Sequence, residues 1–132
     1  MVLVDANALL DILTADPVWF EWSHDAMLRA AGDGLAINPI IYAELAPAFR
    51  EERELAAVLA DWPLQRLPLP YAAAWPAAQA FAAYRRRGGT RSSPLPDFYI
   101  GAHAAVDGLT LLTRDPARYQ TYFPSVALIC PA

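Results

Sequence analysis

Five short apolar runs alternate with longer helical segments along this chain, and the alternation strongly limits the possible folds. Short runs that are apolar throughout are typical of buried strands. They cover residues 2–5, 35–38, 64–69, 110–113 and 126–130. Strands that alternate with helices form βαβ units, in which helical crossovers join parallel strands. We therefore predict an α/β protein with a mainly parallel sheet.

The segments between these runs carry helical signals. Asn38 followed by Pro39 is a good N-cap with proline in the first turn, so a helix should run from Pro39 to about Phe49. Another should open at Pro96 and end near Gly108. Further helices are expected at 7–14, 18–31, 51–61 and 71–87. The 132 residues show no repeat and no long linker, so residues 1–132 are expected to form a single domain.

Two of the apolar runs lead into an aspartate, Asp5 at the end of the first and Asp115 just after the fourth. Ligands of open α/β sheets bind outside the carboxyl ends of the strands, so both carboxylates are expected at one edge. Glu44 and Asp97 lie on helices that start from the same side and can converge there. Two negative charges that lie so close together are costly unless they share a proton or a cation. Since hard oxygen ligands suit Mg²⁺ or Mn²⁺, the four acids predict a divalent-metal site.

Each acid also has a purely structural interpretation. A carboxylate in the first turn of a helix, such as Asp97, is favoured by the helix dipole. Asp115 precedes a proline, and this dipeptide often starts a turn. Glu44 fits an exposed position on an amphipathic helix, and Asp5 fits the cap of the next helix. The catalytic interpretation therefore depends on the combination rather than on any single residue.

The charge composition excludes several kinds of chemistry. The net charge is −4 and the pI is near 5.0, which taken alone argues against a nucleic-acid partner. A bound metal would mask four of the fourteen acids, however, and positive charge gathers in Arg85–Arg87 and Arg91. All ten basic residues are arginine. The absence of lysine excludes a Walker P-loop and Schiff-base catalysis.

The remaining composition predicts a soluble cytoplasmic protein without a membrane anchor. The chain is 56% hydrophobic and 18% charged, which is typical of a globular fold. The single cysteine, Cys130, excludes an internal disulfide and a cysteine-rich zinc site. The first residues lack the pattern of a signal peptide, and the alanine-rich stretch 71–84 is too short to span a bilayer.

The order and spacing of these motifs resemble a known family. Asp5-Ala6-Asn7 after a short strand, a helical Glu44, Asp97 opening a late helix and Thr113-Arg114-Asp115 after a strand are similar to the PIN-domain ribonucleases. The likeness is greatest to the VapC toxins of bacterial toxin–antitoxin pairs, and it covers essentially the whole chain. It implies a three-layer α/β/α sandwich around a parallel five-stranded sheet.

The resemblance also implies roles for the four acids. By position in the family motif, Asp5 and Asp97 would be the main ligands of Mg²⁺ or Mn²⁺. Glu44 and Asp115 would complete the cluster directly or through water. All four would thus be catalytic residues of a metal-dependent endoribonuclease, and no acid of the pattern is missing.

Supporting and RNA-binding positions are expected around this cluster. Thr113 matches a hydroxyl position that supports bound water or phosphate, and Asn7 matches the polar residue two after the first aspartate. Arg87 and Arg91 precede Asp97, so they are placed to meet RNA phosphates near the metal. Arg114 can do the same or pair with the acids. A solvated helix end remains an alternative interpretation for the arginine cluster.

Metal-dependent hydrolysis fits the residues independently, because a divalent ion acidifies bound water and neutralises phosphate charge. A metal-free ribonuclease would instead need a convergent acid–base pair such as His24 and His103, which we expect to be structural. A phosphatase of the haloacid dehalogenase type would need an aspartate where Asn7 stands and a later lysine. A catalytically silent, metal-stabilised binding module for RNA or protein stays open, because ligand residues do not establish geometry.

Partners follow from the same resemblance. Toxins of this kind are held inactive by a VapB-type antitoxin, and an acidic pocket invites an arginine from such a partner. The apolar helices at 18–31, 39–49 and 51–61 offer a groove for an amphipathic segment. The same faces are otherwise used by the core or by self-association, and we expect a homodimer.

Overall fold

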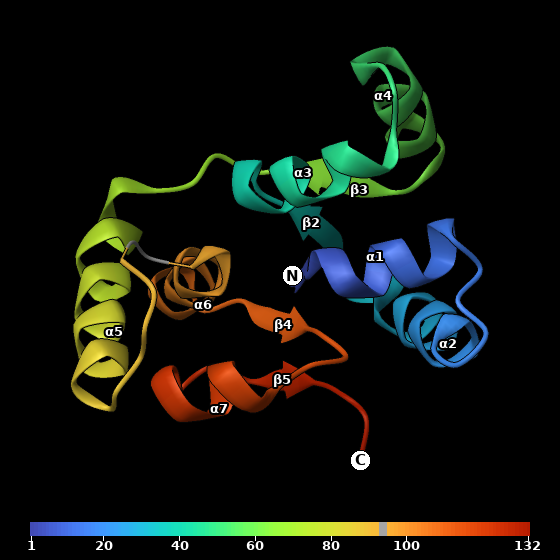
Figure 1. The fold of residues 1–132 in the computed structure, drawn as a ribbon. Coiled ribbons are helices and arrows are strands. Elements are labelled where there is room, and N and C mark those ends of the chain that lie inside the picture. Colours follow the sequence, from blue (N-terminus) through green and yellow to red (C-terminus); the bar gives the residue numbers. More distant parts are fainter. Residues whose placement is uncertain (93–94) are drawn as a thin grey trace.

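Five parallel strands form the centre of the molecule (Figure 1). The computed structural model describes residues 1–92 and 95–132. The strands are β1 (Val2–Val4), β2 (Leu35–Ile37), β3 (Leu64–Arg66), β4 (Thr110–Leu112) and β5 (Leu128–Ile129). Their order is β3-β2-β1-β4-β5, and every neighbouring pair runs parallel. The predicted α/β class and parallel sheet are confirmed.

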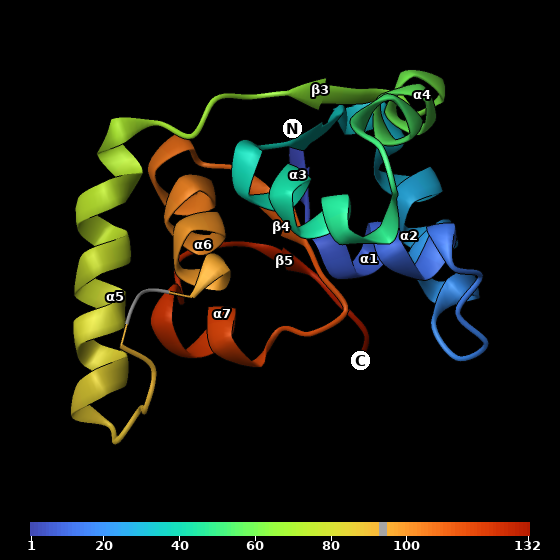
Figure 2. The same cartoon turned by 45° about the horizontal axis from the view of Figure 1, so that its top comes forward.

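Helices cover both faces of the sheet. Successive side chains of a strand point to opposite faces, yet all residues of β1 and β2 are buried. Both strands are therefore covered on both sides, as parallel sheets usually are. This is the three-layer α/β/α arrangement that the resemblance implies, and Figures 1 and 2 show the helices around the central strands.

Seven α-helices connect the strands in the described part of the chain. Their bounds are α1 (Ala6–Leu13), α2 (Phe20–Ala30), α3 (Pro39–Leu45), α4 (Glu52–Asp61), α5 (Ala74–Arg86), α6 (Pro96–Asp107) and α7 (Ala117–Tyr122). Short 3-10 turns at Ala31–Asp33, Ala46–Ala48 and Tyr71–Ala73 follow α2, follow α3 and precede α5. None of these helices combines the length and the apolar character needed to cross a membrane.

Local side chains explain where several helices begin. Asn38 caps α3 as predicted, because its Oδ1 accepts a hydrogen bond from the Ile41 N–H at 2.9 Å and a proline follows. Asp5 caps α1, with its Oδ1 accepting from the Ala6 N–H at 2.8 Å. The structural interpretation of Asp5 is therefore correct, and it uses only one of the two carboxylate oxygens.

Two strands are shorter than predicted. The strand expected at 64–69 ends at Arg66, because Pro68 and Pro70 have no N–H to donate to a neighbouring strand. The strand expected at 126–130 is reduced to Leu128–Ile129. Val126 belongs instead to a turn, in which its N–H donates to the Phe123 carbonyl at 3.0 Å.

Three helical segments also differ from the prediction. The helix expected from residue 18 begins at Phe20, because Asp16 Oδ1 accepts from the N–H groups of residues 18 and 19 and holds them in a turn. The helix expected at 39–49 becomes a 3-10 turn after Leu45, where Pro47 interrupts it. Helix α7 was not predicted, because its six residues are too few to show a helical period.

The strand order places two carboxyl ends side by side. β1 and β4 are neighbours, but the chain continues from β1 toward β2 and from β4 toward β5. Such a switch in direction opens a crevice at the carboxyl ends of the two strands. Asp5 follows β1 and Thr113 follows β4, and the Asp5 N–H donates to the Leu112 carbonyl at 2.8 Å.

Candidate active site

Asp5 is a buried carboxylate that accepts hydrogen bonds from four donors. Its side chain lies at the switch point, and the residue is only 3% exposed. While Oδ1 caps α1, Oδ2 accepts from the Tyr119 hydroxyl at 2.9 Å, from the Thr113 hydroxyl at 3.0 Å and from Asn7 Nδ2 at 3.3 Å. Burial nevertheless dominates and raises the pKa of Asp5 from 3.8 to about 6, with the Asp97 charge adding to the rise.

Tyr119 joins Asp5 to Asp97. Its hydroxyl, which donates to Asp5, also lies 3.3 Å from Asp97 Oδ1. Burial and the neighbouring carboxylates raise the pKa of Tyr119 well above its usual value, so the hydroxyl remains a donor. The second oxygen of Asp97 pairs with Arg118 Nη1 at 3.1 Å. Asp5, which follows β1, and Asp97, in the first turn of α6, thus both lie within hydrogen-bond distance of the Tyr119 hydroxyl.

Glu44 is the third carboxylate of this group. It projects from α3, and its Oε1 is buried without a hydrogen-bond partner. Burial, followed by the charges of Asp5 and Asp97, raises the pKa of Glu44 to about 7. The two aspartates therefore lie close enough to oppose the ionisation of Glu44, although the three residues come from distant parts of the sequence.

Asp115 lies at the rim rather than in this group. The residue is exposed, and its N–H donates to the Thr113 hydroxyl at 3.1 Å. Asp97 and Asp115 line the same cavity, which has a volume of about 400 Å³. The Asn7 amide donates to the Thr113 hydroxyl at 3.0 Å and accepts from the Arg114 N–H at 3.1 Å. The structure thus brings Asn7 and Thr113 into contact with the Asp5 network.

The arginines expected to meet RNA have different surroundings. Arg87 is exposed, with its guanidinium 5.3 Å from the centre of the Tyr122 ring, and Arg91 is also exposed. Arg114 instead pairs with Asp11, its Nε lying 3.0 and 2.9 Å from the two carboxylate oxygens. Asp11 is buried on α1, and Arg114, from the loop after β4, supplies the compensating charge.

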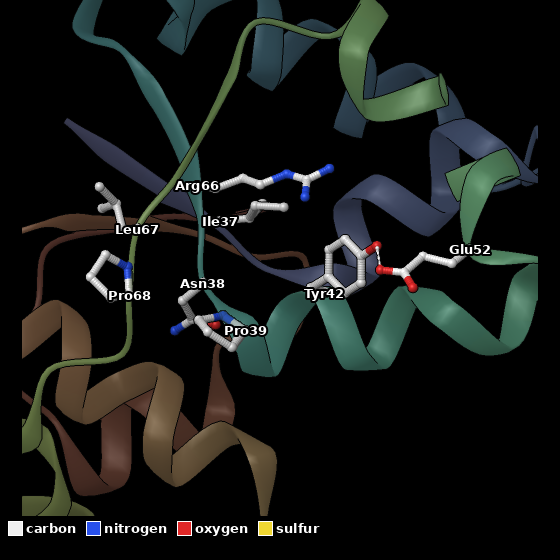
Figure 3. Close-up of a pocket in the computed structure, with 8 residues that line it drawn as sticks. All are labelled: Ile37, Asn38, Pro39, Tyr42, Glu52, Arg66, Leu67 and Pro68. Atoms are coloured by element: carbon white, nitrogen blue, oxygen red, sulfur yellow. Dashed lines mark hydrogen bonds between the residues drawn. The ribbon is translucent and has the colours of Figure 1, made fainter. Parts of the chain in front are cut away.

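A larger cavity lies beside β2 and β3 and contains none of the four predicted acids (Figure 3). It has a volume of about 490 Å³ and is lined by Ile37, Asn38, Pro39, Tyr42, Glu52, Arg66, Leu67 and Pro68. The carboxylate of Glu52 accepts from the Tyr42 hydroxyl at 2.9 Å, and Arg66 lies over the Tyr42 ring. The only carboxylate that lines this cavity, that of Glu52, is therefore already hydrogen-bonded, unlike the buried Glu44 oxygen.

Comparison with known proteins decides the family. The model of the PIN domain family matches residues 2–124, which is nearly the whole chain. The chain belongs to the PIN domain family. PIN domains are generally nucleases and typically use a divalent metal. A comparison with curated proteins gives no match.

Several solved structures have a fold similar to that of this PIN domain. VapBC2 from Rickettsia felis, bound to a promoter DNA fragment, is 16% identical with a TM-score of 0.73, and the match covers 98% of each chain. FitAcB from Neisseria gonorrhoeae is 22% identical with a TM-score of 0.73. DNA-bound VapBC from Salmonella typhimurium is 22% identical with a TM-score of 0.72. Both of these matches cover 98% of this chain and 96% of the other. At these identities, the likeness is one of fold.

The residues of this PIN domain fit a divalent cation. Within residues 1–92 and 95–132, no three acidic, histidine or cysteine side chains form a ready-made metal cage. Arg118 pairs with Asp97, but the unpartnered Glu44 oxygen and the raised pKa values of Asp5 and Glu44 mark a cluster in which negative charge is still crowded. Its donors are carboxylate oxygens, which suit Mg²⁺ or Mn²⁺. Asp5, Asp97 and Glu44 are therefore the residues that would hold such an ion.

The two histidines of this PIN domain do not form an acid–base pair. His103 is fully buried, so it cannot reach a phosphate of RNA. Its Nδ1 faces the Asn38 amide at 3.0 Å, and its Nε2 lies 3.1 Å from Asp107 Oδ2. Since Asn38 uses its oxygen to cap α3, its amide nitrogen donates to Nδ1, which leaves the ring proton on Nε2. His24 is exposed on α2 and stacks on Phe20.

Sequence analysis missed two residues that touch the site. Tyr119 and Arg118 both lie on α7, the helix that was not predicted. A signal was present: after Asp115-Pro116 the chain continues for several residues without glycine or proline, as a short helix opened by proline would. The contacts themselves have no sequence signal, because they join positions more than twenty residues apart.

Proposed function

We propose that this PIN domain is an Mg²⁺- or Mn²⁺-dependent endoribonuclease that acts in the cytoplasm as the toxin of a toxin–antitoxin pair. One observation carries the proposal. The charges of Asp5 and Asp97 help to raise the pKa of Glu44, and the buried Oε1 of Glu44 has no hydrogen-bond partner. Membership of a family of nucleases supports it. One structure of similar fold, from Klebsiella pneumoniae, is described as a toxin–antitoxin complex.

The mechanism assigns a separate task to each side chain. Asp5 and Asp97 would hold the ion, with Glu44 beside them and Asp115 at the rim. When bound, the ion would activate water and neutralise the charge of the phosphate. Thr113 and Tyr119 fix the orientation of Asp5 through hydrogen bonds at 3.0 and 2.9 Å. Glu44, whose buried Oε1 has no hydrogen-bond partner, would be placed to take up the proton of an attacking water.

An RNA digest tests the reaction. Single-stranded RNA should be cut in Mg²⁺ or Mn²⁺ and left intact in EDTA, and the products should carry 5′-phosphate and 3′-hydroxyl ends. Asp5→Asn and Asp97→Asn should largely abolish cleavage, whereas Asp61→Asn, which alters an exposed acid at the end of α4, should not. Cyclic-phosphate ends or full activity in EDTA would refute a metal-dependent hydrolysis.

RNA binding is proposed to use the exposed arginines near α5. Arg87→Ala and Arg91→Ala should weaken RNA affinity more than metal affinity, and each should reduce the dependence of binding on salt, because phosphate contacts release counterions. Arg114→Ala should have a smaller effect on RNA, because this guanidinium pairs with Asp11. Equal RNA affinity of Arg87→Ala, Arg91→Ala and the wild type would assign these two arginines to the solvated end of α5.

The antitoxin is proposed to bind along α3 and α4. The cavity in Figure 3 and a neighbouring one of about 410 Å³ share Tyr42 and Glu52, and both follow these helices. An amphipathic segment of the partner would fill them and direct an arginine to the acids. Expression of this chain alone should slow bacterial growth, and co-expression with a small protein encoded beside it should restore growth. Asp5→Asn should be harmless at equal expression.

The toxin proposal and the nuclease proposal can fail separately. A soluble, well-expressed chain that cuts RNA in vitro but leaves growth and cellular RNA unchanged would remove the toxin role alone. A chain that binds metal and RNA without turnover would instead be a silent binding module. Growth arrest that Asp5→Asn does not relieve would indicate toxicity from a source other than the acid cluster.

Self-association is proposed at the start of α5. Tyr71 is 98% exposed and Trp75 is 74% exposed, and such large apolar side chains are usually covered by a partner when they lie together. A homodimer would cover them. Trp75→Glu should therefore shift the protein to a monomer in light scattering, while Val18→Glu, at an equally exposed apolar position near α2, should leave the mass unchanged.

A further inference from the structure

The cavity of about 400 Å³ beside the acids has a composition that metal binding does not explain. It lies where α5, α6 and α7 meet, and its lining includes Asp97, Asp115, Tyr84, Tyr122 and Arg118. Figures 1 and 2 show these three helices beside one another. Its volume is within the range of sites for small organic groups. The cavity thus opens directly onto one of the proposed metal ligands.

Packing holds the two tyrosine rings of the cavity in place. Tyr84 and Tyr122 meet edge-on, with ring centres 6.5 Å apart. Both rest on Phe98, at 5.6 and 5.5 Å, and Phe98 is fully buried. The loop after α5 adds a further constraint, because a Cβ on Gly89 would lie 2.3 Å from Tyr84 Cε1. The rings therefore form a preformed aromatic wall whose outer part reaches the cavity.

Positive charge accompanies these rings. The Arg87 guanidinium lies 5.3 Å from the centre of the Tyr122 ring, and that of Arg118 lies 5.9 Å from the centre of the Tyr84 ring. Arg118 also reaches Asp97 and so connects the aromatic wall to the acids. A flat ring is suited to stacking on these aromatic and guanidinium groups, and a phosphate attached to that ring would be attracted to Arg87.

We propose that this cavity binds a base of single-stranded RNA next to the phosphate that is cut. The base would stack on the wall formed by Tyr84, Tyr122 and the planar Arg118 guanidinium, while Arg87 would meet a backbone phosphate. Stacking of this kind needs an unpaired base, since the faces of paired bases are covered by their neighbours. The inference rests on the proposed ribonuclease function, and it locates the substrate relative to the acids.

Binding without cleavage tests the subsite. Fluorescein-labelled oligo(U), oligo(A) and oligo(C) RNA would be titrated in EDTA with the wild type, Tyr122→Leu, Tyr84→Leu and Tyr122→Phe. Loss of one stacked base predicts an affinity about 5- to 100-fold weaker for both leucine variants. Tyr122→Phe should bind nearly as well as the wild type, because it keeps the ring. Phe20→Leu, which alters an aromatic residue on α2, should also retain wild-type affinity.

Further measurements separate the possible failures. Thermal unfolding of the same samples shows whether a variant is folded, and Tyr122→Phe keeps the packing on Phe98 if the leucine variants are unstable. Oligo(dC), compared with oligo(C), distinguishes a subsite for RNA from one for any single strand. If the wild type cuts RNA but both leucine variants bind it normally, the subsite is wrong and the nuclease proposal stands. If the leucine variants lose only the small protein partner, the cavity is a protein-binding surface and the proposal is overturned. If the wild type neither binds RNA in EDTA nor cuts it in Mn²⁺, both proposals fail.

Discussion

Replacing Asp5 with asparagine should make the metal-free protein more stable at neutral pH while abolishing its activity. Burial raises the pKa of Asp5 from 3.8 to about 6. One pH unit of difference in pKa corresponds to about 1.4 kcal/mol, so the ionised carboxylate costs the folded protein about 3 kcal/mol. Asparagine carries no charge and does not incur this cost.

The hydrogen bonds of Asp5 offset part of that gain. Its two oxygens accept from four donors, whereas the single oxygen of asparagine cannot satisfy all of them. Losing one such bond costs about 1 kcal/mol. The free energy of unfolding of Asp5→Asn should therefore exceed that of the wild type by about 1–2 kcal/mol at about pH 8.

The pH dependence has a definite sign. Below about pH 4 the Asp5 carboxyl is protonated in both the folded and the unfolded chain, so burial of a charge costs nothing. Between about pH 4 and about pH 6 the unfolded chain has released this proton while the folded chain still holds it, and above about pH 6 both have lost it. Wild-type stability consequently falls over this window, and the advantage of Asp5→Asn should appear over the same window.

Urea unfolding in EDTA, followed by circular dichroism at several pH values, measures this difference. Asp61→Asn is a matched control, because it removes an exposed carboxylate and should give a small difference that does not follow this window. A variant at Asp5 that is less stable than the wild type at about pH 8 would refute the reasoning, as would a gain that persists unchanged at acid pH.

Three further substitutions test other contacts. Tyr119→Phe keeps the ring but removes the hydroxyl between two carboxylates, and calorimetry should find Mn²⁺ affinity about 10- to 100-fold weaker; unchanged affinity would show that the hydroxyl does not orient the ligands. Arg114→Ala should lower the free energy of unfolding by about 1–3 kcal/mol in urea, because a buried carboxylate loses its charged partner. Gly101→Ala should cost about 1–3 kcal/mol in the same assay, since its Cβ would lie 2.3 Å from Phe123 Cδ2, whereas Gly32→Ala, with open space around it, should show no such clash.

The fold could be predicted from the sequence because its signals are local. Apolar runs marked all five strands, and the Asn38-Pro39 pair marked the start of α3. Errors arose where a local signal was weak or outweighed. Prolines ended β3 early, and α7 was too short to show a period. Parallel pairing followed from alternation of the elements, without knowledge of any single contact.

The candidate site was only partly predictable for a physical reason. Asp5 and Asp97 were found because each stands at the end of a strand or the start of a helix, positions that sequence patterns mark. Tyr119 was missed because its role depends on a contact across 114 positions. The burial of Asp11 was missed for the same reason, since its partner Arg114 is 103 positions away.

The hydroxyl bond between Asp5 and Tyr119 also bears on how this protein is made. Ribosomes synthesise chains from the N-terminus, so Asp5 emerges long before the residue that lies 114 positions later. A nascent chain that ends before α7 has the first strand and all three clustered acids, but it lacks the helix that joins Asp5 to Asp97. The completed arrangement therefore requires nearly the whole domain to be synthesised, and a ribosome-bound fragment cannot carry it while it is surrounded by RNA.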